Sequence, residues 1–311
     1  MDKQFQIIPD QASTVAAQVD HLFYFLTAVT AFFTVGIFVV ILYFALKYRR
    51  RPGIKPVVVE TNTTLEITWT AIPLVICLFL FGWAAKLYVQ LETPPKDAME
   101  INIIGKQWMW KAQHPEGVRE INSLHIPVNR KIKLTMTSQD VIHSFYIPAF
   151  RTKQDVVPGR YTQEWFEPTK VGEYHLFCAE YCGSQHSGMI GSVIVMNQSE
   201  YQSWLSGISP NVPMVLSGEK LFAEKQCNTC HGQRAPTLAG VFGRRVQLND
   251  GSTAVADENY LRESILQPNA KMVAGYPPIM PTYQGQLSEE QINELIGYMK
   301  TLKEATTQPT Q

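Results

Sequence analysis

Two long apolar runs in the first ninety residues constrain the fold more than any other feature of the sequence. From Leu22 to Tyr48 no charged residue appears before Lys47, and none appears from Ile67 to Ala85. A helix of about 20 apolar residues crosses the hydrocarbon core of a bilayer, whereas core helices of soluble proteins rarely stay uncharged for so long. We therefore expect two transmembrane helices, at about 22–48 and 67–90.

The loop between the two runs sets the expected orientation of the chain. Basic residues gather in this loop, and acidic residues prevail before the first run; the loop residues are Lys47, Arg49, Arg50, Arg51 and Lys55. Cytoplasmic loops carry such an excess of Lys and Arg. We expect both termini on the outer, periplasmic side, and a first span retained as an anchor because it lacks a small-residue cleavage site.

Composition shifts beyond the membrane divide the chain further. Residues 97–198 contain short β-like runs between Pro and Gly, at 99–105, 131–138, 157–166, 172–178 and 191–197, which predict a sandwich or barrel. Residues 199–213 are expected to form a linker, 214–304 a mainly helical domain and 305–311 a tail, after an N-terminal segment with both spans at 1–96. In the helical domain Ser217 and Ser288 are expected to cap helices, and Leu287, Ile292, Leu295, Ile296 and Met299 mark one apolar face.

Soft metal ligands cluster in the β-region. Cys178, Cys182, His186 and Met189 fall within one short segment, and His143 precedes them at the end of a strand-like run. Thiolates, imidazoles and a thioether suit copper, and two cysteines can bridge two copper ions that share one charge. A disulfide or a zinc site is the alternative, but either would leave the methionine unexplained. The remaining histidines, among them His114 and His125, lack such neighbours and are expected to be ordinary surface or core residues.

The spans together with HSFYIPAF, KQDVVPGR and CAEYCGSQHSGM resemble subunit II of cytochrome c oxidase over residues 20–200. The resemblance implies a cupredoxin-like β-sandwich with a dicopper CuA centre. Its main ligands would be His143, Cys178, Cys182 and His186, with Met189 and the backbone carbonyl of Glu180 as weaker ones.

Three further roles follow from the same resemblance. The Glu180 side chain would help to hold a magnesium ion shared with subunit I, and a carboxylate suits that hard cation. Trp108 resembles the tryptophan through which electrons enter the copper site. Glu66 resembles an acidic residue at the cytoplasmic mouth of a proton channel.

A haem attachment signal lies in the last domain. Cys227, Cys230 and His231 form a C-x-x-C-H motif, in which two cysteines bind the haem vinyl groups and the histidine binds iron. A redox-active dithiol is the alternative, but no βαβ pattern supports it. Methionine as the sixth ligand raises the potential, and Met280 in a proline-rich loop is the expected one, with Met272 as the second choice.

Residues 214–304 resemble a class I cytochrome c, so the whole chain is similar to caa3-type oxidases with a fused cytochrome c. The expected function is electron entry: an external cytochrome or other donor reduces covalent haem c, and electrons pass through CuA to a separate subunit I that reduces dioxygen to water. The chain would thus be a multi-pass subunit of a proton-translocating oxidoreductase in the bacterial cell membrane, in contact with lipid and other oxidase subunits, with no catalytic residue of its own.

Two alternatives keep these cofactors. One is the dicopper subunit of a haem–copper nitric oxide reductase, and the other is a membrane-tethered electron carrier or copper-delivery protein. Nucleic-acid binding is not expected, because 27 basic and 27 acidic residues leave the chain with no net charge.

Overall fold

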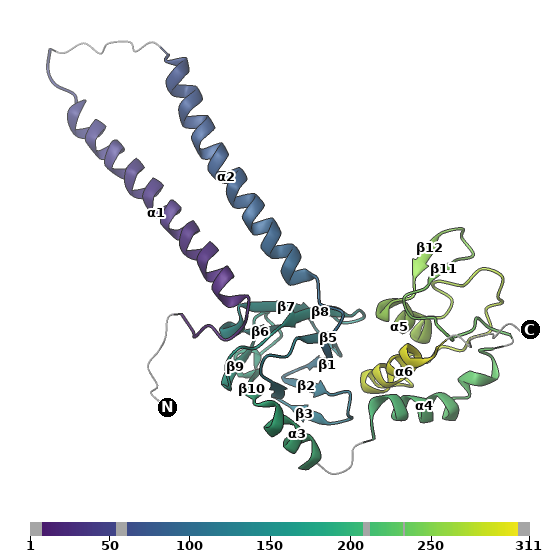
Figure 1. The fold of residues 1–311 in the computed structure, drawn as a ribbon. Coiled ribbons are helices and arrows are strands. Elements are labelled where there is room, and N and C mark those ends of the chain that lie inside the picture. Colours follow the sequence, from purple (N-terminus) through teal and green to yellow (C-terminus); the bar gives the residue numbers. More distant parts are fainter. Residues whose placement is uncertain (1–7, 54–60, 208–211, 233, 304–311) are drawn as a thin grey trace, which may run out of the picture. The chain divides into compact units, whose positions relative to one another are not determined.

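The computed structural model describes residues 8–53, 61–207, 212–232 and 234–303 (Figure 1). It separates into a membrane unit, residues 14–93, and an outer unit made of residues 1–13 and 94–311. Lys55, residues 208–211 of the expected linker and the tail 305–311 lie outside the described residues.

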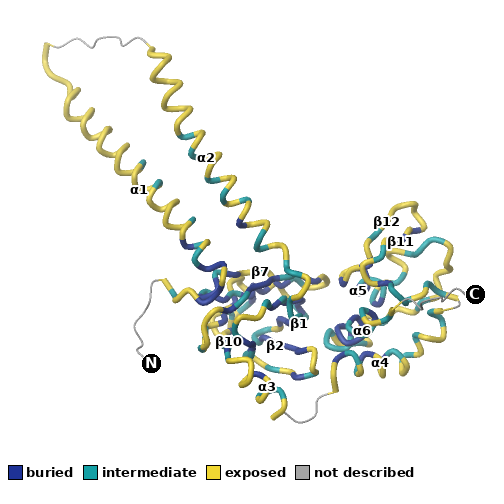
Figure 2. Tube along the Cα trace, viewed as in Figure 1, coloured by how far each residue is buried: buried dark blue, intermediate teal, exposed yellow. Residues whose placement is uncertain are grey.

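The membrane unit is a pair of helices, α1 (Ala16–Lys47) and α2 (Thr63–Glu92). Both helices extend beyond the uncharged runs that predict them, by about two to three turns each. Asn62 caps α2, because its side chain accepts a hydrogen bond from the backbone N–H of Leu65 at 3.1 Å. The ring of Phe25 contacts Trp83 with centroids 5.7 Å apart. Most apolar side chains of both helices are exposed (Figure 2), as expected for helices that face lipid.

A sandwich of two five-stranded sheets forms the first part of the outer unit. The first sheet has the order β3-β2-β1-β5-β8 and the second the order β4-β10-β9-β6-β7; within each, one pair is parallel, β1 with β5 and β10 with β4. The strands are β1 (Met99–Lys106), β2 (Met109–Gln113), β3 (Arg119–Ile121), β4 (Ser123–Pro127), β5 (Ile132–Ser138), β6 (His143–Ile147), β7 (Thr152–Val156), β8 (Thr162–Phe166), β9 (Gly172–Cys178) and β10 (Ile190–Met196).

Alternating side chains of both sheets fill the sandwich core. Ile101, Leu134, Phe145 and Val193 are completely buried there, which accounts for the period-two pattern of their strands. Four further strands, β2, β3, β4 and β7, are short, and the sequence pattern does not predict them. His143 begins β6, where the end of a strand had been expected.

A helix packs on this sandwich within the segment expected as a linker. In α3 (Gln198–Gly207), Tyr201 is buried and Trp204 stacks on His125 with centroids 4.5 Å apart. Beneath them Glu120 accepts hydrogen bonds from His114 Nε2 at 2.8 Å and from His125. Burial raises the pKa of Glu120, but these hydrogen bonds outweigh burial and lower it to about 2. The two histidines thus have structural partners, and residues 198–207 extend the β-domain.

The last part of the outer unit is helical with one small hairpin. Its elements are α4 (Met214–Glu224), the 3₁₀ turn η3 (Cys227–Thr229), the strands β11 (Arg245–Gln247) and β12 (Thr253–Val255), α5 (Glu258–Leu266) and α6 (Glu289–Thr301). Helices α4 and α6 cross closely at Gly218, where an added Cβ would lie 2.0 Å from the carbonyl oxygen of Glu294. Only glycine permits this approach.

Of the two helix caps predicted in the helical domain, one is confirmed and one is wrong. Ser288 caps α6 in a capping box with Gln291, and the predicted apolar face is confirmed: Ile292, Leu295, Ile296 and Met299 are buried, with Leu287 packed against them. The prediction for Ser217 is wrong. Helix α4 begins at Met214, and the backbone N–H of Ser217 already donates within the helix to the carbonyl of Pro213 at 3.0 Å.

Candidate metal and haem sites

Strand pairing brings the first candidate ligands together. Phe145 of β6 lies opposite Cys178 at the end of β9, and the backbone N–H of Ala179 donates to the carbonyl of Ser144 at 2.9 Å. His143, two residues before Phe145, therefore reaches the point where β9 ends. The loop after β9 then folds back and carries Cys182 to the same place.

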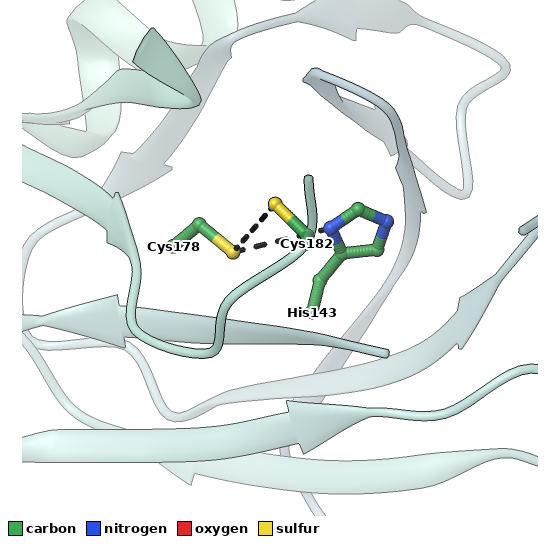
Figure 3. Close-up of side chains that lie close together, drawn as sticks. All are labelled: His143, Cys178 and Cys182. Atoms are coloured by element: carbon green, nitrogen blue, oxygen red, sulfur yellow. Dashed lines mark hydrogen bonds between the residues drawn. The ribbon is translucent and has the colours of Figure 1, made fainter. Parts of the chain in front are cut away.

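His143, Cys178 and Cys182 form a buried group in which one ligand atom of each lies within 4.8 Å of the others (Figure 3). The Sγ atoms of the cysteines are 3.7 Å apart, and Cys178 Sγ lies 3.9 Å from His143 Nδ1. A disulfide requires an S–S distance of about 2.05 Å. The cysteines are free, and both sulfurs can bind one metal ion at metal–thiolate distances of about 2.3 Å.

The other expected ligands continue this group on the side of Cys182. Its Sγ lies 3.5 Å from His186 Nδ1 and 3.8 Å from the Sδ of the buried Met189. The carbonyl oxygen of Glu180 accepts from Cys178 Sγ at 3.3 Å, while the Glu180 side chain is exposed. All six predicted residues therefore meet at one place, with two thiols in the middle and one imidazole on each side. Such soft donors fit copper.

The thiols of Cys178 and Cys182 influence each other's pKa. Burial raises the pKa of Cys178, but hydrogen bonding to His143 and to backbone groups outweighs burial and lowers it to about 6. Burial and the neighbouring Cys178 thiolate raise the pKa of Cys182 to about 12. For His143 burial lowers the pKa, yet the Cys178 thiolate and Asp140 raise it overall. One thiolate therefore forms readily, and a second one requires a cation such as a metal ion.

Sequence reasoning missed the residues that orient this group. Asp140 Oδ1 accepts from His143 Nε2 at 2.8 Å, which leaves Nδ1 directed at the sulfurs. Gln107 Nε2 donates to the carbonyl of Cys182 at 2.7 Å, and Trp108 Nε1 donates to the same oxygen at 3.3 Å. A carboxylate three residues before a candidate histidine was the available signal for Asp140. The role of Trp108 in electron entry stays a prediction.

Around the C-x-x-C-H motif the helical domain encloses a largely apolar cavity of about 400 Å³. Cys227, His231, Met272 and Met280 line it, together with side chains of α5 and α6. His231 Nδ1 donates to the carbonyl of Pro236 at 2.8 Å, which leaves Nε2 free to bind a metal. The size, the apolar lining and the prepared histidine fit a haem. Both candidate methionines face this cavity.

Three family models together match most of the chain. The transmembrane domain of cytochrome c oxidase subunit II matches residues 2–85, its periplasmic domain matches residues 116–197, and cytochrome c matches residues 215–303.

Curated relatives match along the whole architecture. Cytochrome c oxidase subunit 2 of Alkalihalophilus pseudofirmus is 31% identical, with 88% of this chain and 84% of the relative covered. The chain belongs to the cytochrome c oxidase subunit 2 family. Family members of the same description from Bacillus subtilis (28% identical, 85% and 83% covered) and Thermostichus vulcanus (31%, 64% and 77%) are also similar.

Membership confirms the main predictions. The chain is subunit 2 of a membrane-bound bacterial haem–copper oxidase, with two transmembrane helices and a periplasmic domain, and it transfers electrons into that oxidase. The subunit 2 domain implies CuA copper, the cytochrome c domain implies covalent haem c, and the complex implies a subunit I partner. The predicted fold class is confirmed as well.

Replacing Asp140 by alanine is expected to weaken copper binding by about 10- to 100-fold, because His143 loses the hydrogen bond that orients its ring. Competition with a copper chelator on the purified chain measures this affinity. Asp97→Ala is the matched control, since Asp97 is exposed and pairs only with Lys131 among the ion pairs of the described residues. Equal affinity in the two variants would contradict the orienting role.

Proposed function

We propose that this chain is the electron-entry subunit in which haem c and CuA act in series. Cys227 and Cys230 attach the haem, and His231 and Met280 bind its iron. His143, Cys178, Cys182 and His186 hold the two copper ions, with Met189 and the carbonyl of Glu180 as weaker ligands. An external donor supplies electrons to the haem, and subunit I receives them from the copper domain.

One observation carries this proposal: donor atoms of His143, Glu180, His186 and Met189 lie around the two adjacent sulfurs of Cys178 and Cys182. The distances of 3.3–3.9 Å between neighbouring donors leave room for metal ions between them. When bound, two copper ions that share one unpaired electron supply one-electron transfer with little change in geometry. The protein contributes a rigid frame, because His143 and Cys178 belong to paired strands.

The helical domain has the features that haem binding requires. The hydrogen bond from His231 Nδ1 to Pro236 orients the imidazole, and the apolar lining of the cavity would surround much of the ring. A methionine ligand would keep the potential higher than a second histidine would. Because both domains belong to one chain, the haem stays near the copper domain at an effective concentration on the order of millimolar.

Cys182→Ser is expected to abolish the mixed-valence copper signal and most of the bound copper, because Cys182 contacts Cys178, His186 and Met189 at once. Copper analysis and electron paramagnetic resonance of the purified chain provide the measurement, with the haem content as an internal check. Cys77→Ser is the control, since Cys77 lies in α2. A variant that retained two coppers and an unchanged signal would refute the copper assignment.

Met280→Leu is expected to lower the haem reduction potential and to remove the absorption band of an iron–thioether bond, whereas Met272→Leu leaves both unchanged. The physical reason is that a weak sulfur ligand favours ferrous iron. Redox titration followed by optical spectroscopy distinguishes the two. The reverse result would assign the sixth position to Met272.

We also propose that the exposed carboxylate of Glu180 helps to hold a magnesium ion together with subunit I. Its place between two copper-binding cysteines, with its side chain exposed, supports this role. Glu180→Gln should release magnesium from the purified complex while copper stays bound through the unchanged backbone carbonyl. Elemental analysis decides, and undiminished magnesium would argue against the proposal.

A further inference from the structure

The haem domain and the sandwich meet at a surface of opposite charge. Cations on β2, β3 and β5 face anions on α5 and α6. The pairs are Lys111 with Glu290 (Nζ–Oε1 2.9 Å), Arg119 with Glu294 (Nη2–Oε1 2.6 Å) and Lys133 with Glu258 (Nζ–Oε1 3.3 Å). One pair has the reverse polarity, since Lys300 of α6 faces Glu100 of β1. Such complementarity fixes the register of an interface.

Lys300 of α6 ties the two sides together at one end of this surface. Its Nζ lies 3.0 Å from Glu100 of β1 and 2.9 Å from Glu258 of α5, and Thr135 donates to Glu100 at 2.6 Å. Burial raises the pKa of Glu100, but Lys300 and Lys133 outweigh it and lower the pKa to about 2. Burial lowers the pKa of Lys300, yet Glu100 and Glu258 raise it overall. Glu100 and Lys300 therefore form a charged pair at neutral pH.

Tyr161, directly before β8, anchors the same surface, and it lines one cavity of about 200 Å³ together with Glu100, Glu258 and Lys300. Its side chain is only 4% exposed and belongs to the hydrophobic core of the haem domain, although the strand that follows it belongs to the sandwich. The hydroxyl donates to Asn293 Oδ1 at 2.5 Å, and its backbone N–H donates to Asn259 Oδ1 at 2.6 Å. Arg262 also donates to the carbonyl of Gly159, just before Tyr161 in the chain, at 2.8 Å. One domain thus completes the core of the other.

Helices α5 and α6 have two functional faces. Leu261 and Ile265 of α5 and Leu295 of α6 line the haem cavity, whereas their charged and amide side chains contact the sheet. The proline-rich loop at the cavity contributes Ile279, which is 44% exposed. The copper domain therefore contacts the sides of α5 and α6 that face away from the haem cavity. The proline-rich loop at the cavity remains accessible.

We infer that the haem domain is clamped to the sheet β3-β2-β1-β5-β8 by Tyr161 and by the cluster of Glu100, Lys133, Glu258 and Lys300, and delivers electrons to the copper domain from this docked position. This inference rests on the proposed function. The alternative arrangement is a haem domain that diffuses on its tether and meets the copper domain only transiently.

The two arrangements predict different kinetics. A domain that diffuses on a tether searches for its contact, so its transfer rate falls with solvent viscosity and varies with linker length. A clamped domain transfers electrons in one fixed geometry, so the rate depends on neither. Partly buried ion pairs are screened only weakly, so moderate salt should also have little effect on the clamped domain.

The test uses the purified, fully loaded oxidase complex with Tyr161→Ala, Tyr161→Phe, Lys300→Met and, as matched control, Lys131→Met. Lys131 forms an exposed ion pair with Asp97, which is 70% exposed, so its loss should have little effect. Flash reduction of the haem followed by its reoxidation gives the rate of transfer to copper. Hydrogen exchange of β8 and α5 reports docking independently of electron transfer.

We expect Tyr161→Ala and Lys300→Met to raise exchange on both sides of the interface and to slow transfer by about tenfold or more, with a new dependence on viscosity. Tyr161→Phe, which retains the ring, should change transfer less, and Lys131→Met should behave as the parent. Unchanged exchange or an unchanged or faster transfer in Tyr161→Ala and Lys300→Met would overturn the inference. Copper and haem contents of the parent complex separate that outcome from a failure of the proposed function.

Discussion

The pairing of β6 with β9 is the interaction on which the copper site depends. It places His143 beside Cys178, and the hydrogen bond from Ala179 to Ser144 continues the alignment into the loop that carries Cys182. A shift of one residue would turn His143 to the other face of its strand. The buried core around Phe145 prevents that shift, so packing energy is what holds the ligands in place.

Burial of the two thiols has an electrostatic consequence for metal binding. The environment of Cys178 favours its thiolate, whereas Cys182 is held neutral by burial and by the negative charge beside it. A metal ion removes this conflict, because it stabilises both thiolates at once. Asp140 contributes from outside by orienting His143. Strand pairing and the bond to Asp140 thus hold the ligands in a fixed arrangement, which suits a centre whose geometry should change little during electron transfer.

In the haem domain, too, packing positions the backbone and a hydrogen bond orients the candidate ligand. The close crossing of α4 and α6 at Gly218 sets the helical frame, and the hydrogen bond of His231 to Pro236 prepares a single nitrogen for iron. Because α5 and α6 line the cavity with one face and contact the sandwich with another, the helices that enclose the haem also join the domains. Membership in the cytochrome c oxidase subunit 2 family places this assembly in a respiratory complex.

The sequence by itself determined which residues are the candidates for the chemistry. Uncharged runs identify the membrane helices because charge in the bilayer is costly, and the cysteine, histidine and methionine spacings identify the cofactors because few other uses explain them. Local signals also located the cap at Ser288, but they misplaced the cap of α4. They missed α3 and several short strands, because these elements are stabilised by packing against the rest of the fold rather than by the intrinsic propensities of their residues. Asp140, the role of Tyr161 in the haem-domain core and the charge cluster around Lys300 were decided only by the tertiary structure. The bond from His143 to Asp140 is local, but its effect depends on the sulfurs that face the other ring nitrogen. The contacts of Tyr161 and of Lys300 join residues far apart in the chain, and no local pattern encodes which distant strand or helix will lie opposite.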